Sequence, residues 1–297
     1  MSFEVTTAFV QQYSANVQHL VQQKGSRLRD CVEVESGIRG KQAFFDQIGT
    51  VAAQRVLNRH GDSPLNTTPH RRRRVALFDY DTGDLIDDLD RVKMLIDPTS
   101  PYAQAHGWAM GRGMDDEIIN AAFATSFTGE DGSTPITFPA GQVVAVNSWT
   151  YGTGAGNAGL TISKLIEAKT ILDGNEADPD EERYLACSAK QIANLLATTE
   201  ATSADYANVK ALVEGKIDTF MGFKFKRTQR LLTDGSGFRR VMAWNKSGLK
   251  LGIGMDIKAR IAERADKRFS TYVYFCMSIG ATRMEEEKVI EIKCLEV

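Results

Sequence analysis

The sequence predicts an α+β fold. Apolar residues recur at helical spacing in several segments, they alternate with charged residues in others, and residues 31–74 show neither pattern clearly. With 297 residues, of which 42% are hydrophobic and 25% charged, the chain can bury a sizeable core. We therefore expect a folded globular protein of one or two domains.

The first 21 residues predict an amphipathic helix. Between residues 3 and 21, apolar side chains recur at helical spacing among glutamines. They are Phe9, Val10, Tyr13, Val17, Leu20 and Val21. A helix with one apolar face needs a surface to lie on, so we expect this segment to form an arm.

Residues 31–74 predict a long extended segment. This part of the chain contains glycines at 37, 40, 49 and 61, prolines at 64 and 69, and scattered apolar residues such as Phe44, Phe45 and Ile48. Long segments without regular structure are uncommon inside compact domains and usually serve a function or contact a partner.

A long helix is predicted after the prolines at 98 and 101, because proline is favoured in the first helical turn. Small and apolar residues share one stripe as far as position 122, which predicts a helix of about six turns. The middle third mixes both structures: strand character at 135–146, a glycine-rich stretch at 150–159, helices near 162–172, 189–196 and 206–215, and a strand at 218–227.

The C-terminal part predicts strands at 241–244, 249–253, 271–277 and 289–294. In the last of these, Ile290 and Ile292 alternate with Glu291 and Lys293, which is the period of a strand. We find no internal repeat and no proline-rich linker. The chain is therefore expected to end in a sheet.

Composition excludes several classes of protein. A formal net charge of -2 provides no overall field that would attract nucleic acid or an anionic membrane. Four cysteines lie far apart without a CxxC pair, which argues against both a metal site and a disulfide framework. No signal-peptide core or membrane-spanning apolar run is present, so we expect a protein made in the cytoplasm, with no metal and no cofactor.

The segment from Gly154 to Gly159 fits the GxGxxG pattern of dinucleotide-binding proteins, and Asp173 follows at about the distance of a ribose-binding acid. However, residues 147–153 separate the pattern from the preceding strand, and Asp173 is expected at the end of a helix. No lysine follows Gly159, as a phosphate-binding loop requires. We interpret the segment as a flexible surface loop and keep a dinucleotide-binding enzyme as an alternative.

The aspartates at 79 and 81, which follow an apolar run, resemble the carboxylate pair of haloacid-dehalogenase phosphatases. That motif needs threonine or valine where Gly83 stands, and a calcium loop needs glutamate where Asp90 stands. The four histidines are isolated, and no serine lies in a GxSxG motif. The sequence therefore predicts no catalytic residue, and we prefer a solvated acidic face or an intersubunit charge patch.

Several longer features occur in a fixed order. They are Arg72-Arg73 before the acidic stretch, Ile86 to Leu95, Asp97 to Tyr102, Arg112 to Asp115 with Ile118-Ile119, and Ser278 to Met284 followed by Val289 to Cys294. In this order the chain resembles, over nearly its whole length, the major capsid (coat) proteins of tailed double-stranded-DNA bacteriophages with the Hong Kong 97 type fold. The resemblance implies a structural subunit, not an enzyme, that self-assembles into hexamers and pentamers of an icosahedral head enclosing double-stranded DNA. An encapsulin-like compartment shell is the alternative with the same fold.

The resemblance also implies a division of the chain. Residues 1–36 would form an N-terminal arm, 37–78 an extended E-loop, 79–146 a peripheral domain with a spine helix at about 101–125, 147–242 an axial domain, and 243–297 the return to the peripheral sheet. The implied partners are other copies of the chain, portal and scaffolding proteins, with or without a decoration protein, and packaged DNA through weak nonspecific contact, with no membrane. The implied location is the virion, after assembly in the host cytoplasm.

Subunits of a shell must bury large areas against one another, and extended segments supply such area efficiently. Our candidate apolar contacts are Phe9, Val10 and Tyr13 in the arm and Phe44, Phe45 and Ile48 in the E-loop; packing inside the same subunit is the alternative. The charged candidates are Arg71, Arg72, Arg73 and Arg74 on one side and Asp84, Asp87, Asp88 and Asp90 on the other. Opposed charges of this kind would set register between subunits more than affinity.

Overall fold

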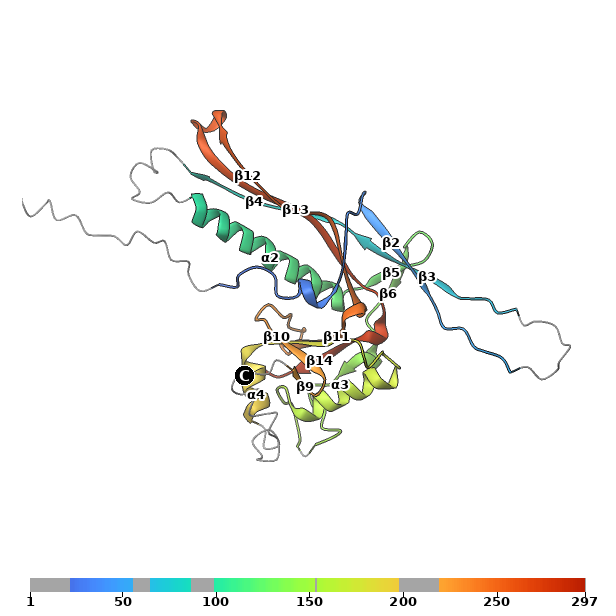
Figure 1. The fold of residues 1–297 in the computed structure, drawn as a ribbon. Helices are drawn as coiled ribbons and strands as arrows, with labels where there is room; N and C mark the ends of the chain where they lie inside the picture. Colours follow the sequence, from blue (N-terminus) through green and yellow to red (C-terminus); the bar gives the residue numbers. More distant parts are fainter. Residues whose placement is uncertain (1–21, 56–64, 87–98, 153, 198–218, 297) are drawn as a thin grey trace, which may run out of the picture. The chain divides into compact units, whose positions relative to one another are not determined.

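The computed structural model describes residues 22–55, 65–86, 99–152, 154–197 and 219–296, and it shows an α+β protein (Figure 1). The chain divides into two compact units. The first takes residues 1–26, 79–113 and 256–277, and the second takes residues 27–78, 114–255 and 278–297. The chain therefore passes between the two units several times.

A four-stranded sheet has the order β1-β12-β13-β4. Its strands are β1 (Glu33–Ser36), β12 (Leu249–Arg264), β13 (Ser270–Arg283) and β4 (Phe78–Ile86). In the first unit, helix α2 (Thr99–Phe123) covers one face of this sheet, because His106 stacks on Phe275 with ring centroids 6.2 Å apart. The Nδ1 atom of His106 also lies 2.9 Å from Oγ1 of Thr82 in β4.

A second sheet, in the second unit, has the order β2-β3-β5-β6 and is antiparallel throughout. Its strands are β2 (Gln42–Ile48), β3 (His70–Ala76), β5 (Ser126–Thr128) and β6 (Thr134–Ile136). Gln42 pairs with Ala76 at one end of the β2–β3 hairpin and Ile48 with His70 at the other. Figure 1 shows the two strands of the hairpin continuing side by side past β5 and β6. The segment expected to be extended is therefore a long hairpin.

The main core of the second unit lies around a six-stranded sheet of order β7-β14-β11-β8-β10-β9. Its strands are β7 (Val143–Val144), β14 (Val289–Cys294), β11 (Arg239–Asn245), β8 (Arg183–Cys187), β10 (Phe223–Arg227) and β9 (Thr219–Phe220). Strand β8 pairs in parallel with β10 and antiparallel with β11. The helices of this region are α3 (Ile162–Gly174) and α4 (Ala189–Ala197). Short 3₁₀ turns are η2 (Arg29–Cys31), η3 (Ala140–Gln142), η4 (Lys246–Gly248), η5 (Ala265–Lys267) and η6 (Glu286–Lys288).

Burial in this core follows the sequence pattern. On α3, Leu165, Ala168 and Leu172 are fully buried, at the spacing of one helical face. Trp244 in β11 is fully buried. Its indole N–H has a hydrogen-bond partner in the core, because it donates to the Cys31 carbonyl at 2.9 Å. Residues 29–31 are thereby fixed to the six-stranded sheet.

The predicted elements mostly occur where expected. The long helix and the last strand are confirmed, as are helices α3 and α4. Strands β12 and β13 extend well beyond the predicted 249–253 and 271–277. The acidic stretch contains strand β4, which was not predicted, and its aspartates at 79, 81 and 84 are exposed. The predicted helices at 3–21 and 206–215 lie outside the described residues. Among the helices that the structure describes, none is long and apolar enough to cross a bilayer.

Candidate functional site

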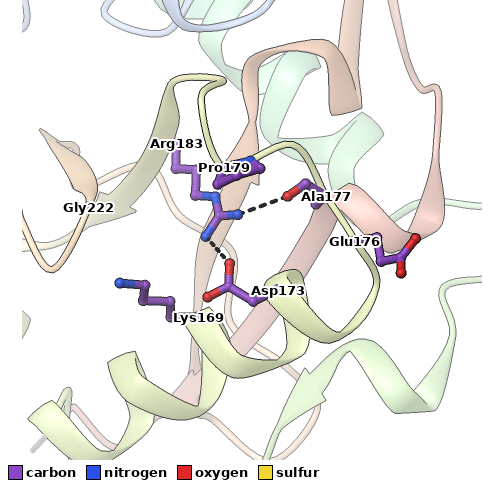
Figure 2. A pocket seen from close by; sticks show the side chains of 7 residues that line it. All are labelled: Lys169, Asp173, Glu176, Ala177, Pro179, Arg183 and Gly222. Carbon is purple, nitrogen blue, oxygen red and sulfur yellow. Dashed lines mark hydrogen bonds and ion pairs between the residues drawn. The ribbon is translucent and has the colours of Figure 1, made fainter.

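A cavity of about 460 Å³ lies beside the C-terminal end of α3, and Figure 2 shows its lining. The guanidinium of Arg183 projects into it but is already engaged: Nη1 donates to Asp173 at 2.6 Å and Nη2 donates to the Ala177 carbonyl at 3.0 Å. Lys169 and Glu176 complete the charged lining. The lining offers no nucleophile with an adjacent base. We interpret the Arg183 contacts as a tie that holds the end of α3 against β8.

The described residues of the glycine-rich segment form a loop that is mostly exposed, as expected, and several of its residues also pack against the rest of the chain. Trp149 donates from its indole N–H to the Gly156 carbonyl at 3.0 Å, and a Cβ atom at Gly154 would lie 2.5 Å from the Trp149 ring. A Cβ atom at Gly159 would overlap the Asn194 side chain. Gly154 and Gly159 permit close packing within the chain, and Gly156 has a φ of +80°, which favours glycine. All three glycines therefore have conformational roles that need no dinucleotide.

Lys164 of helix α3 also holds the glycine-rich segment in place. This lysine is fully buried, and its ammonium donates to the carbonyls of Ala158 at 2.8 Å and Lys293 at 2.9 Å. Burial lowers the pKa of Lys164, because the charged form is poorly solvated there. The lysine therefore joins the glycine-rich segment to strand β14.

The acidic motif also lacks the geometry of a phosphatase. Asp79 and Asp81 lie at the second and fourth positions of the nine-residue strand β4, and both are exposed. A nucleophilic aspartate at the end of a strand, beside a pocket, is therefore not formed. Within the part of the chain that the structure describes, no group of His, Cys, Asp and Glu side chains is arranged to hold a metal ion.

The predicted apolar contacts of the extended segment separate into two classes. Phe44 and Ile48 are 41% and 72% exposed. Phe45 is only 8% exposed, because it packs with Val75 and Met284 in a small core at the base of the hairpin. Packing within the same subunit, which the sequence left open, therefore holds for Phe45.

The four arginines at 71–74 also have different environments, because successive residues of β3 point to opposite faces. Arg71 is exposed, and Arg72 donates to the Asp46 carboxylate at 2.6 Å on the neighbouring strand. That hydrogen bond lowers the pKa of Asp46. Arg74 lies over the Phe127 ring, 4.3 Å from its centroid.

Arg73 is the exception, since it is 1% exposed. It donates to the Met284 carbonyl at 2.9 Å and to Glu286 Oε1 at 2.7 Å. Arg283, fully buried, lies 3.6 Å from Glu286 and donates to the Ala122 carbonyl at the end of α2. Burial lowers the pKa of Arg283. Arg73 therefore has no exposed surface for a neighbour, and the prediction of an intersubunit contact is not supported at this residue.

Sequence reasoning missed this buried cluster of Arg73, Arg283 and Glu286. It also missed several exposed apolar side chains, among them Val51, Leu65 and Ile261, which are 49%, 97% and 55% exposed. Val51 and Leu65 continue the two strands of the β2–β3 hairpin. Their position in a segment with few core residues was the signal that could have identified them.

Of the remaining candidates, Asp84 is exposed in β4 and accepts a hydrogen bond from the Leu85 N–H at 2.8 Å. The others lie outside the described residues: Phe9, Val10, Tyr13, Asp87, Asp88 and Asp90. The hairpin therefore presents exposed apolar side chains that another chain can cover, whereas the polar clusters described above join parts of the same chain.

The comparisons with known proteins identify the family. The model of the phage capsid protein family matches residues 5–296, so the chain belongs to that family and is a structural subunit of a phage capsid. No curated protein matches the chain.

Solved phage capsids share the fold. The capsid of cyanophage P-SCSP1u has a TM-score of 0.75 at 18% identity, covering 99% of this chain and 95% of that chain. The capsid of Ralstonia phage GP4 has a TM-score of 0.76 at 12% identity, covering 98% and 96%. For cyanophage Pam1 the values are 0.68 and 14%, with 97% of each chain covered. The tailed-phage capsid fold expected from the sequence is thereby confirmed, and the subunit is a component of the virion that assembles with copies of itself.

Proposed function

We propose that this subunit forms the hexamers and pentamers of an icosahedral head that encloses double-stranded DNA. The single observation that carries the proposal is the β2–β3 hairpin, whose exposed apolar side chains are useful only when a neighbour covers them. The match to the phage capsid family supports a phage head in preference to an encapsulin-like compartment. Portal and scaffolding proteins, with or without a decoration protein, complete the proposed particle, which assembles in the host cytoplasm.

The proposed contacts begin with the apolar side chains of the hairpin. Phe44, Ile48, Val51 and Leu65 are all at least 40% exposed within the chain. Covering one such aliphatic or aromatic side chain completely stabilises an interface by about 1.5–3 kcal/mol. Four such side chains on one hairpin can therefore contribute much of the free energy of association between one copy and its neighbour.

Charged residues would fix the register of these contacts. Arg71 is exposed on β3, and Asp84 is exposed on β4. We assign the intersubunit role to these two, and not to Arg72, which binds Asp46 of its own chain. The near-neutral net charge of -2 fits an inner wall that contacts DNA weakly.

The proposed segments follow the capsid fold: an arm at 1–36, an E-loop at 37–78, a peripheral domain at 79–146, an axial domain at 147–242 and a return to the peripheral sheet at 243–297. The β2–β3 hairpin lies within residues 37–78, which supports the proposed E-loop. The six-stranded sheet takes most of its strands from the proposed axial domain and the return, and β7 from the end of the proposed peripheral domain.

The double variant Ile48→Asp/Leu65→Asp tests the proposal. It places two charges among the exposed apolar side chains without disturbing the core, so we expect a folded subunit with an unchanged unfolding midpoint that no longer forms shells in sedimentation velocity. Tyr151→Asp, at a residue that is 49% exposed elsewhere in the second unit, is the matched control and should assemble normally. Shells from the double variant at the yield of the unmodified chain would contradict the role of the hairpin.

A further inference from the structure

The part of the β1-β12-β13-β4 sheet that lies in the first unit has acidic residues on one edge and the cations Lys258 and Arg260 on the other. Strand β4 forms one edge, since it follows β13 at the end of the strand order. Asp79, Asp81 and Asp84 are exposed along β4, and residues 78–86 contain no lysine or arginine. The β4 edge is therefore purely acidic.

Strand β12 forms the opposite edge over its second half. Its partner β1 pairs only with residues 250–253, so nothing in the described part of the chain pairs with the outer side of β12 beyond them. Every residue from Lys258 to Glu263 is exposed. Lys258 and Arg260 lie on this edge between the exposed acids Asp256 and Glu263, and alternation places Glu263 on the opposite face from the two cations. Ile261 is 55% exposed. The basic part of the edge is therefore the pair Lys258 and Arg260. A free edge of this length is a ready site for another chain.

The acidic and basic side chains share one face of the sheet. Arg264 lies over the Tyr272 ring at 5.5 Å, and a Cβ atom at Gly83 would contact the same tyrosine. Tyr272 stacks on Tyr274 at 5.8 Å, so both mark the face opposite the one that α2 covers. Because side chains alternate along a strand, Lys258 and Arg260 share this face with Arg264, and Asp79 and Asp81 share it with Gly83.

We propose that the acidic β4 edge of one copy docks beside the basic β12 edge of the next copy. The contact joins two different surfaces, so it is heterologous, and repetition by rotation closes a ring of copies. Asp79 and Asp81 then face Lys258 and Arg260 of the neighbour. This interface deepens the proposed function, on which it rests. It uses Asp79 and Asp81, whereas Asp84, proposed above to set the register of the hairpin contacts, lies on the other face of β4.

Charge complementarity favours a second copy as the occupant. DNA would be attracted by Lys258 and Arg260 but repelled by the aspartates of β4, whereas a second copy offers aspartates to the first pair and cations to the second. Exposed ion pairs contribute only about 0.2–1 kcal/mol each, so their main effect is to select and align the neighbour.

The two edges cannot pair within one chain. Strand β13 separates them, so their backbones lie about 9–10 Å apart, at two strand spacings. A disulfide requires Cα atoms within about 7 Å. Cysteines introduced on both edges can therefore join only different copies.

The first experiment oxidises assembled particles of the Asp81→Cys/Arg260→Cys variant, made like its single variants in a Cys276→Ser background, because half-buried Cys276 lies on β13 between the two edges. On a non-reducing gel we expect a ladder that continues past dimers, because each copy carries both halves of the contact, and no ladder from the unmodified chain or from either single variant. Dimers from Asp81→Cys alone would mean that two β4 edges meet, and monomers from particles of the double variant would mean that the edges do not meet. Either result overturns the proposal.

Charge reversal gives an independent test. Asp79→Lys/Asp81→Lys and Lys258→Asp/Arg260→Asp should each lower particle yield by about tenfold or more, while the quadruple variant recovers most of it, since the pairing is restored with reversed signs. Glu263→Lys, on the same strand but the opposite face, is the matched control and should assemble normally. The contrary result is normal particles from both reversed variants, with DNA retention lost only from Lys258→Asp/Arg260→Asp. That result would assign the basic edge to DNA and refute the proposal. The unmodified chain must form particles in the same preparation; its failure would count against the proposed function and not against this interface alone.

Discussion

Replacing Glu286 with glutamine removes the negative charge that lies between two buried guanidinium groups. Glu286 Oε1 accepts from Arg73 at 2.7 Å and lies 3.6 Å from Arg283 Nε. The side chains of Arg73, Arg283 and Glu286 are 2%, 0% and 9% exposed, so water cannot replace the lost charge. The two arginines would then face each other without a counter-charge.

Removing one partner of a buried ion pair costs about 3–5 kcal/mol. The free energy of unfolding falls by about 3 kcal/mol for each 1 M of urea, so this loss lowers the urea concentration at the unfolding midpoint by about 1–1.7 M. The neighbouring pair of Arg72 and Asp46 is 40% and 65% exposed, and its loss in Arg72→Met should cost at most about 1 kcal/mol. The two variants therefore compare adjacent arginines of one strand in opposite environments.

The assay is urea unfolding of dissociated subunits, followed by the fluorescence of the tryptophans, of which Trp244 is fully buried. The double variant Arg73→Met/Glu286→Gln should lose less stability than the sum of the single variants, by about 1–3 kcal/mol, because the two side chains interact directly. A midpoint for Glu286→Gln no lower than that of Arg72→Met would refute this account of the buried cluster.

Two further predictions concern buried groups of the second unit. Lys164→Met should destabilise the subunit by about 2 kcal/mol, because two backbone carbonyls lose a charged donor. The variant should also be cleaved faster in the glycine-rich segment during limited proteolysis. An unchanged rate of cleavage would contradict the proposal that Lys164 holds this segment in place. Burial raises the pKa values of the thiols of Cys187 and Cys294 to about 12, and raises that of Cys31 as well. At pH 8, a thiol reagent should therefore label only half-buried Cys276 in the folded chain and all four cysteines in urea; rapid labelling of a second thiol in the folded chain would contradict the burial described.

The sequence predicted the elements whose pattern is local. The stripe of small and apolar residues located α2, and alternation of Ile290 and Ile292 with charged residues located β14, because each pattern reports directly which face is buried. Strand β4 was not predicted, since its aspartates are tolerated only because it lies at the edge of a sheet, and edge position depends on the whole fold.

The candidate contacts show the same limit. Four consecutive arginines contain no alternation that could distinguish inward from outward positions, so Arg73 could not be separated from Arg71 and Arg72. Its partner Glu286 lies 213 residues away along the chain. Phe44 and Phe45 are likewise identical in type, and only the pairing of β2 with β3 decides which of the two is buried.

The central claim is that this chain is a shell-forming subunit, and electron microscopy of the purified, expressed chain tests it most directly. We predict closed shells, or rings of capsomers, formed from this chain together with a scaffolding protein where one is needed. A subunit that folds normally by circular dichroism but stays monomeric at high concentration, with and without scaffolding protein, would contradict the claim.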